Sequence, residues 1–344
     1  MRGFRVLTGL LLWLLAAAAS AQAPAAAASA PAAAAVAPAA APARAAAQEV
    51  TVGTYINKIQ DLNFRENKYT LDFFVWFRWK AEGALKDYKP LESFEIINGR
   101  IDGKGSIVEK KIGDVSYASA RITATIAETW ELHNFPFDWH RTEVRIEDSV
   151  FTADQLVFVA DKENSRLGEE IDMSGWSASA FSAEVTTKTY RTNYGDISLP
   201  SGNKSEYSRF AISWDLDRNG WGVAVKLLST VFLATAVAFV SFMVKPSDLD
   251  ARFGMGVGGL FAVAASAFIA SGFVPESGGM TLADQMHMVS LGFIFATLLL
   301  SAFCLRLEVS GKEELAFRID HWALAILPVL FYGWAAWVIR QSLH

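Results

Sequence analysis

The residues whose types and spacing best suit a specific role form one short segment, Phe135, Pro136, Phe137 and Asp138. Two aromatic rings flank a proline, and a carboxylate follows, between two runs of strand-like alternation. Proline fixes its own backbone and pushes the preceding residue toward extended geometry, so the segment is predicted to be a rigid loop. Two rings on a loop favour contact with an apolar surface; an ordinary hairpin turn with a solvated charge is the alternative.

Sequence patterns typical of catalysis or metal binding do not occur. The five histidines, at positions 133, 140, 287, 321 and 344, lack a metal-ligand spacing such as HExxH, and no nucleophile elbow or phosphate-binding loop is found. His133 and His140 flank the loop and can in principle share a metal, but exposed turn histidines are more common. We therefore predict that the protein is not an enzyme and needs no metal or other cofactor.

Charge and cysteine content narrow the class of protein further. The net charge is −5 and no basic cluster occurs, which argues against a nucleic-acid partner. The one cysteine, Cys304, falls in an apolar run, so an internal disulfide is not available.

The first 48 residues are predicted to lie outside the fold. Residues 1–23 combine Arg2 and Arg5 with an apolar run and a small-residue exit, which is typical of a secretory signal peptide. A membrane anchor is the weaker alternative because the apolar run is short. Residues 24–48 are nearly all Ala and Pro, a composition typical of a semi-extended linker.

Residues 49–218 alternate with period two between turn residues, which predicts an all-β domain. Leu71, Phe73, Val75, Phe77 and Trp79 would share one face of a strand. Phe210, Ile212, Trp214 and Leu216 would do the same on a later strand. Roughly ten such strands fit a β-sandwich of the immunoglobulin-like type.

Residues 219–344 are predicted to form a four-helix transmembrane domain. Apolar runs near 221–244, 253–274, 283–305 and 322–339 are each about the length of a bilayer-spanning helix. With the β-domain exported, the loops at 245–252 and 306–318 would face the cytoplasm, and their Lys and Arg residues agree with the positive-inside rule.

The second span differs from the other three because it holds Gly254, Gly256, Gly258 and Gly259. Each glycine would weaken a soluble helix by about 1 kcal/mol, so close helix packing or a functional reason is expected. Steps of three and four place one stripe of residues on a single helix face. The stripe consists of Asp250, Gly254, Gly258, Phe261, Ala265, Phe268 and Gly272. Such a stripe is suited to line a pore.

The order of these elements resembles the pentameric ligand-gated ion channels, specifically their short bacterial members. In that family a signal peptide precedes a β-sandwich with a Phe-Pro-x-Asp loop, and four spans follow, of which the second lines the pore. "FPFD" at 135–138 is the most specific match, with "RNG" at Arg218 and "ADQM" at 283–286. Glu128 and Thr142 stand where animal receptors carry paired cysteines, and the link between the third and fourth spans is short, as in bacterial members.

The resemblance implies that the loop couples the β-domain to the spans. Phe135 and Phe137 would then contact the outer ends of the spans and the loop at 275–281, and Asp138 would pair with Arg218. The expected coupling residues are Phe135, Pro136, Phe137, Asp138 and Arg218. Phe261 and Phe268 would form the closed gate of the pore, since apolar rings can exclude water; packing against neighbouring helices is the alternative.

The resemblance also implies agonist binding between subunits, under a hairpin formed by the last two strands. The candidate ligand-binding residues are Tyr190, Tyr194, Tyr207 and Phe151 of one subunit and Phe74, Trp76 and Arg78 of its neighbour. Aromatic faces attract organic cations by about 0.5 to 2 kcal/mol, which favours an amine, whereas Arg78 favours a carboxylate. Simple interface packing of Phe74 and Trp76, and a proton as agonist, remain open.

The cytoplasmic mouth gives mixed indications of ion selectivity. "ARFGMG" from Ala251 resembles the Ala-Arg opening of the family's anion channels, yet five copies of Asp250, with Asp248 nearby, would form a ring that attracts cations. Arg252 is predicted to lie off the stripe and to extend toward lipid headgroups. The expected preference is therefore weakly cationic.

These expectations describe a homopentamer in the cell (inner) membrane, with its β-domain in the periplasm or outside. Its partners would be itself, the lipid bilayer, inorganic ions and a small-molecule or proton agonist. A membrane-spanning ligand sensor that does not conduct is the rival from another class, and an anion-selective channel is the rival within the family.

Overall fold

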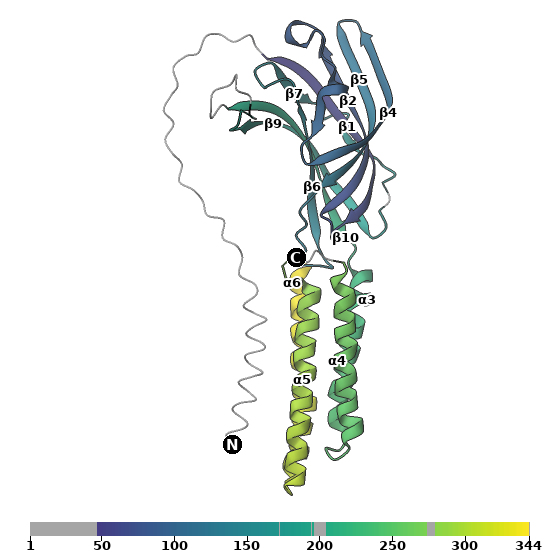
Figure 1. Cartoon of the computed structure of the whole chain (residues 1–344). Coiled ribbons are helices and arrows are strands. Elements are labelled where there is room, and N and C mark those ends of the chain that lie inside the picture. The colour runs from purple at the N-terminus through teal and green to yellow at the C-terminus, as the bar shows by residue number, and fades with distance from the viewer. Residues whose placement is uncertain (1–46, 172, 194, 196–203, 274–278, 344) are drawn as a thin grey trace. The chain divides into compact units, whose positions relative to one another are not determined.

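Figure 1 shows the computed structural model of the chain, which describes residues 47–171, 173–193, 195, 204–273 and 279–343. The expected signal peptide and nearly all of the expected linker lie outside these residues. The chain divides into two compact units. One consists of strands and the other of helices, and each is described here by itself.

The strand unit is built from two sheets and a few short turns of helix. Its strands are β1 (Gln48–Asn63), β2 (Lys68–Lys80), β3 (Phe94–Ile96), β4 (Gly99–Ile112), β5 (Val115–Ala127), β6 (Trp139–Asp148), β7 (Leu156–Ala160), β8 (Arg166–Leu167), β9 (Trp176–Tyr190) and β10 (Ser205–Arg218). A 3₁₀ turn, η1 (Gly83–Leu85), and the short helix α2 (Pro90–Ser93) lie between β2 and β3.

The two sheets have different strand orders. The first runs β4-β5-β2-β1-β7, with β8 also paired to β1, and the second runs β3-β6-β10-β9. β2 lies antiparallel to β1 and β5, whereas β7 and β8 run parallel to β1. The architecture is the predicted β-sandwich.

The core of the sandwich forms because alternate side chains of each sheet point toward the other sheet. The predicted inward faces are confirmed: every second residue of β2 from Leu71 to Trp79, and of β10 from Phe210 to Leu216, is buried. Rings from opposite sheets meet there, with Tyr69 of β2 and Trp214 of β10 at 6.1 Å between centroids. Hydrophobic alternation along the strands therefore determines which face each sheet buries.

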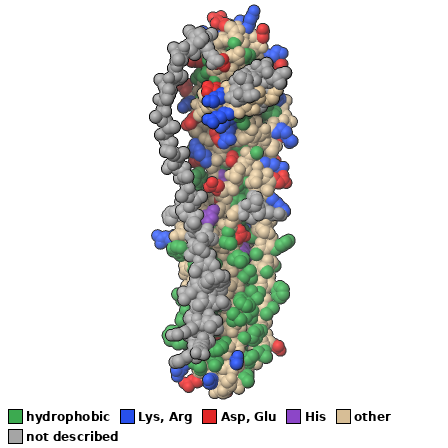
Figure 2. All heavy atoms as spheres, turned by 60° about the vertical axis from the view of Figure 1, so that its left-hand side comes forward, with side chains coloured by type: hydrophobic (Ala, Val, Ile, Leu, Met, Phe, Trp, Pro, Cys, Tyr) green, Lys and Arg blue, Asp and Glu red, His purple; other side chains and the backbone are tan. Residues whose placement is uncertain are grey.

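The helical unit contains four long helices together with the loop Glu131–Asp138. The helices are α3 (Trp221–Val240), which continues into the 3₁₀ turn η2 (Ser241–Met243), α4 (Leu249–Ser271), α5 (Leu282–Val309) and α6 (Glu313–Ser342). All four are long and apolar enough to cross a membrane. Hydrophobic side chains cover the helices in Figure 2, whereas Lys, Arg, Asp and Glu side chains gather over the strands.

Aromatic side chains fill the interior of the helical unit. Phe239 of α3, Phe293 of α5 and Phe331 of α6 pack with centroid distances of 5.4 to 6.3 Å. A second cluster joins Val263 of α4 to Ile294 of α5 and to alanines of α3. The four helices thus pack as one bundle, and α4 presents only one of its faces to that bundle.

Candidate functional site

The loop Glu131–Asp138 is joined to the helical unit through its backbone. The carbonyl oxygens of His133 and Phe135 accept hydrogen bonds from the Leu282 and Ala283 amides, at 2.9 and 3.3 Å. These amides open α5, where the first N–H groups of a helix have no partner within it. The Phe135–Pro136 peptide bond is cis.

Asp138 and Arg218 form the ion pair that the family resemblance implies. The Arg218 Nε donates to Asp138 Oδ1 at 2.8 Å, and Nη2 donates to Oδ2 at 3.0 Å. Both side chains are buried: 9% of the Arg218 side chain and 1% of the Asp138 side chain are exposed. The guanidinium carbon also lies 5.1 Å from the centre of the Phe135 ring. A planar fork on a carboxylate fixes the orientation of both groups.

The two rings of the loop contact different helices. Phe135 stacks on Phe273, just beyond the end of α4, with 6.5 Å between centroids. Phe137 packs edge-on against Trp221, the first residue of α3, at 5.0 Å. Residues 275–278 of the expected contact loop lie outside the described residues. The loop therefore contacts the start of α3, the start of α5 and the residue Phe273 just beyond α4.

Gly220, just before α3, allows the loop to approach closely. A Cβ atom at this position would lie 2.0 Å from the carbonyl oxygen of Pro136. That separation is far below van der Waals contact and involves backbone, which cannot rotate away. The close approach of the two segments thus depends on glycine.

The predicted stripe on α4 is one exposed face of the helix. Every residue of the stripe, from Asp250 to Gly272, is exposed within the single chain, including Phe261 at 73% and Phe268 at 82%. The opposite face, which includes Gly256, Gly259 and Val263, packs against α3 and α5. The period of 3.6 residues therefore divides α4 as the sequence predicts.

The four glycines of α4 have two different surroundings. At Gly256 a Cβ atom would lie 2.4 Å from the Leu298 side chain, and at Gly259 it would lie 3.2 Å from the Ala234 carbonyl oxygen. At Gly254 and Gly258 it would meet nothing within 4 Å. Close helix packing explains Gly256 and Gly259, whereas Gly254 and Gly258 lie on the exposed stripe.

Arg252 lies off the stripe, but the expectation that it extends toward lipid headgroups is wrong. Its side chain is completely buried and pairs with Asp320 of α6, with Nη1 at 2.8 Å from Oδ2. It also donates to the Ser301 hydroxyl and to the Val244 carbonyl oxygen. A charge inside a helical bundle needs such partners, and Asp320 supplies the opposite charge.

Tyr190 and Tyr207, on β9 and β10, are brought together as expected. Their rings pack edge-on with 5.7 Å between centroids. The Tyr190 hydroxyl donates to Glu147 and accepts from Arg209 Nη2 at 3.0 Å. Burial and the nearby Glu147 carboxylate raise the pKa of Tyr190. The ring pair therefore lies beside a charged pair that the sequence did not suggest.

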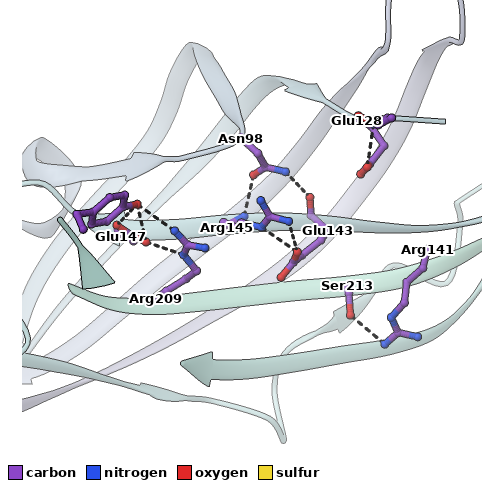
Figure 3. A network of polar contacts seen from close by, with 10 residues as sticks. Asn98, Glu128, Arg141, Glu143, Arg145, Glu147, Arg209 and Ser213 are labelled. Carbon is purple, nitrogen blue, oxygen red and sulfur yellow. Dashed lines mark hydrogen bonds and ion pairs between the residues drawn. The ribbon is translucent and has the colours of Figure 1, made fainter. Parts of the chain in front are cut away.

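Glu147 and Arg209 belong to a charged row on the second sheet. Figure 3 shows Glu147 bound to Arg209, and further along β6 it shows Arg145 between Glu143 and Asn98. The Glu147 side chain is almost completely buried, with 2% exposed. Its charge is balanced by Arg209 across the β6 and β10 pair, where residues 147 and 209 are in register.

Trp76 and Arg78 on β2 share one partner within the same chain. Trp76 Nε1 and Arg78 Nη2 both donate to Asp161 Oδ2, at 3.0 and 2.8 Å. Asp161 is buried, whereas Arg78 is partly exposed. Because Asp161 balances its charge, Arg78 gives little support for a carboxylate ligand.

Three candidate ligand residues remain, and the structure describes two of them, Phe151 and Phe74. The Phe151 amide donates to Asp148 Oδ1, and its ring packs edge-on against Tyr88 at 5.4 Å. Phe74 lies on β2 with its side chain half-buried. Tyr194 lies outside the described residues.

Within the described chain, no group of three or more His, Cys, Asp or Glu side chains is placed to hold a metal ion.

Sequence reasoning missed Glu147, Arg209, Asp161 and Asp320. For Asp320 a signal was available. It lies at the edge of an apolar run, where a carboxylate usually pairs with a polar or charged group inside the bundle. The others had no comparable signal, because acids and bases alternate along several strands.

No protein-family model matches this chain. The chain is similar to γ-aminobutyric acid receptor subunits. Subunit gamma-4 from Gallus gallus is 22% identical over 280 residues, which cover 73% of this chain and 57% of the relative. A subunit beta from Lymnaea stagnalis is 24% identical over 204 residues, covering 58% and 36%. Subunit gamma-3 from Mus musculus is 23% identical over 190 residues, covering 54% and 38%.

The chain thus spans about half the length, or less, of these relatives. The longest of the three matches is long enough to include parts of both the strand unit and the helical unit, because neither unit alone has 280 residues.

Proposed function

We propose that this chain is the subunit of a pentameric ligand-gated ion channel, in which α4 of each subunit lines the pore. The exposed stripe of α4 carries this proposal. Five of its seven residues are small or charged, and they lie on the face of α4 that the other three helices leave uncovered. By contrast, the exposed face of α6 carries Phe317, Trp322, Val329 and Trp337, which suit lipid.

In a ring of identical subunits, the stripe of each α4 would face a central, water-filled pore. One helix cannot enclose a pore, and closed cyclic symmetry lets the same face of each copy meet at one axis. Five copies follow from the resemblance to the pentameric channels. The similarity to receptor subunits over most of the chain supports this assignment.

An agonist would bind between the β-domains of neighbouring subunits. Tyr190, Tyr207 and Phe151 would come from one subunit, and Phe74, Trp76 and Arg78 from the next. The packed rings of Tyr190 and Tyr207 and the neutralisation of Arg78 by Asp161 both favour a small organic cation. A proton remains the alternative agonist.

The loop Glu131–Asp138 would transmit agonist binding to the pore. Its contacts with the ends of α3, α4 and α5 support this role. The protein would sit in the inner membrane with the β-domain in the periplasm, because the loops at 245–252 and 306–318 carry the Lys and Arg residues expected on the cytoplasmic side.

Two measurements on the purified full chain test the proposal. Native mass spectrometry should give five copies, and reconstituted liposomes should show ion flux when small amines, amino acids, divalent ions or protons are added in turn. A pentamer without flux under any condition would favour the non-conducting sensor. A mass other than five copies would overturn the architecture.

The agonist site has its own test once an active compound is known. Replacing Tyr207 by Ala should raise the half-maximal agonist concentration by about 2 to 30 fold, as loss of one aromatic face predicts. Ile107→Ala, an exposed apolar residue on β4 of the first sheet, is the control. Equal effects of the two substitutions would place the agonist elsewhere.

A further inference from the structure

The Arg252 guanidinium is completely enclosed by partners from three other elements. Nε donates to Ser301 Oγ of α5 at 3.0 Å, and Nη1 donates to Asp320 Oδ2 of α6 at 2.8 Å. Nη1 also donates to the Val244 carbonyl oxygen at 3.0 Å, and Nη2 to Asp320 Oδ1. The ring of Phe242, in η2, lies 5.4 Å from the guanidinium carbon. One side chain thus ties the start of α4 to η2, α5 and α6.

The rest of the packed face of α4 consists mainly of small residues and one larger apolar side chain, Val263, which packs against Ile294 of α5. Gly256 and Gly259 lie against Leu298 and Ala234, and only Ser266, toward the other end, adds polar contacts, to Leu227 and His287. Glycine surfaces let helices approach closely, but they offer no side chain that would resist rotation of one helix against another. Among the described residues, the Arg252 contacts are therefore the only charged contacts that hold α4 in its rotation, and they lie at the start of the helix.

The rotation of α4 decides which charge faces away from the bundle. Asp250 and Arg252 are the only charged residues of α4, and two residues correspond to about 200° around a helix. With Arg252 held inside, Asp250 must point outward, as observed. A half-turn of α4 would exchange the two charges.

We propose that Asp320 is a positioning residue for ion conduction that acts through Arg252. By pairing with Arg252 it sets the rotation of α4, so that Asp250 and the glycines of the stripe face the pore, and it keeps the cation away from the mouth. This inference rests on the proposed channel function. The peripheral helix α6 thereby controls the charge of a pore that it does not line.

The test compares variants in a Cys304→Ser background, which removes the only native thiol and keeps a hydrogen-bonding group beside Asp320 and Arg252. Asp320→Asn removes the charge, and Asp320→Glu retains it. Glu314→Gln on the same helix is the control, because the Glu314–Arg318 pair is exposed. The double substitution Arg252→Met with Asp320→Leu removes both charges and keeps the volume, a change that buried ion pairs usually tolerate.

Two measurements follow the rotation of α4. The first is cross-linking by dibromobimane between Val263→Cys and Ile294→Cys, which replace two buried neighbours, in detergent-solubilised full chain. The second is the reversal potential of reconstituted protein in asymmetric sodium chloride. Asp320→Asn should slow cross-linking at least tenfold and move the reversal potential toward zero. Asp320→Glu and Glu314→Gln should leave both unchanged.

The proposal is overturned if assembled Asp320→Asn keeps the parental cross-linking rate and reversal potential. If Asp320→Asn does not assemble, the double variant decides: parental cross-linking would overturn the proposal, and at least tenfold slower cross-linking would support it. Cross-linking needs no ion flux, so it tests the role of Asp320 in positioning α4 even if the parent chain does not conduct. Absence of flux in the parent would count against the channel function alone.

Discussion

Asp138 and Arg218 are 80 positions apart in the sequence, yet they form a buried ion pair with two parallel hydrogen bonds of 2.8 and 3.0 Å. The pair joins the end of the Phe-Pro-Phe-Asp loop to the residue that leads into α3. The Arg218 amide also donates to the Asp138 carbonyl oxygen at 3.3 Å, so backbone and side chains hold the same two residues together.

Removing this pair should impair both assembly and gating. Asp138→Ala leaves the Arg218 guanidinium buried without its partner, which typically destabilises a protein by about 3–5 kcal/mol. Asp215→Ala is the matched control because its pair with Arg141 is partly exposed and should contribute about 0–1 kcal/mol. Native mass and agonist-evoked currents provide the measurements. Normal pentamers with normal currents in Asp138→Ala would rule out the coupling role.

Gly220→Ala should disrupt the close approach of the loop to the start of α3. The new Cβ would lie 2.0 Å from the Pro136 carbonyl oxygen, so the backbone must move, at a cost of at least about 1–3 kcal/mol. Gly222→Ala, two residues later, meets nothing within 4 Å and should be neutral or stabilising. Thermal unfolding of the purified protein compares them, and equal midpoints for both variants would contradict the prediction.

Phe268→Ala should raise the spontaneous leak of the reconstituted channel. The Phe268 ring is 82% exposed on the stripe, and an apolar ring in each subunit can close a pore by excluding water. Phe317→Ala is the control, because Phe317 is a similarly exposed ring, at 71%, but lies on α6, away from the proposed pore. Flux without agonist is the measurement. If Phe268→Ala is well expressed and silent, the ring packs against a neighbouring helix instead.

Asp250→Asn should weaken the preference for cations. Five Asp250 carboxylates would form a negative ring, and Arg252 cannot cancel it while Asp320 holds the guanidinium inside the bundle. The reversal potential in asymmetric sodium chloride should therefore lie toward the sodium equilibrium potential and move toward zero in the variant. A parental value near the chloride equilibrium potential would instead assign the protein to the anion-selective channels.

Glu95→Gln should stabilise the protein in a pH-dependent way. Partial desolvation of Glu95, which occupies an exposed position of β3, and then the charges of Glu147 and Asp148 raise its pKa above the usual 4.5. The native state then binds the Glu95 proton more tightly than the unfolded state, so this group lowers stability as pH rises from 4.5 through the native pKa. The thermal midpoint of Glu95→Gln should exceed that of the parent at neutral pH.

The gain should disappear below pH 4.5, where Glu95 is protonated in both states. Glu109→Gln, an exposed acid on β4, controls for the general loss of one negative charge. A stabilisation of Glu95→Gln that is equally large at both pH values would show that the charge of Glu95 is not its cause.

Local periodicity was sufficient to predict much of this structure. The alternation in β2 and β10 identified the faces that the sandwich buries, and the steps of three and four in α4 identified its exposed stripe. In the strands this follows because the hydrophobic effect buries every second side chain, and in α4 it follows because residues three and four apart share one helix face. The Asp138–Arg218 pair was expected from a family resemblance and not from local pattern.

Only the tertiary structure decided how the buried polar groups are paired. Arg252 pairs with Asp320, 68 positions away, and Trp76 and Arg78 share Asp161, more than 80 positions away. Many acids in the sequence have a suitable charge for these roles. The pairing is decided by which acid the packed chain brings within hydrogen-bond distance of each cation, because a buried charge is tolerated only beside such a partner.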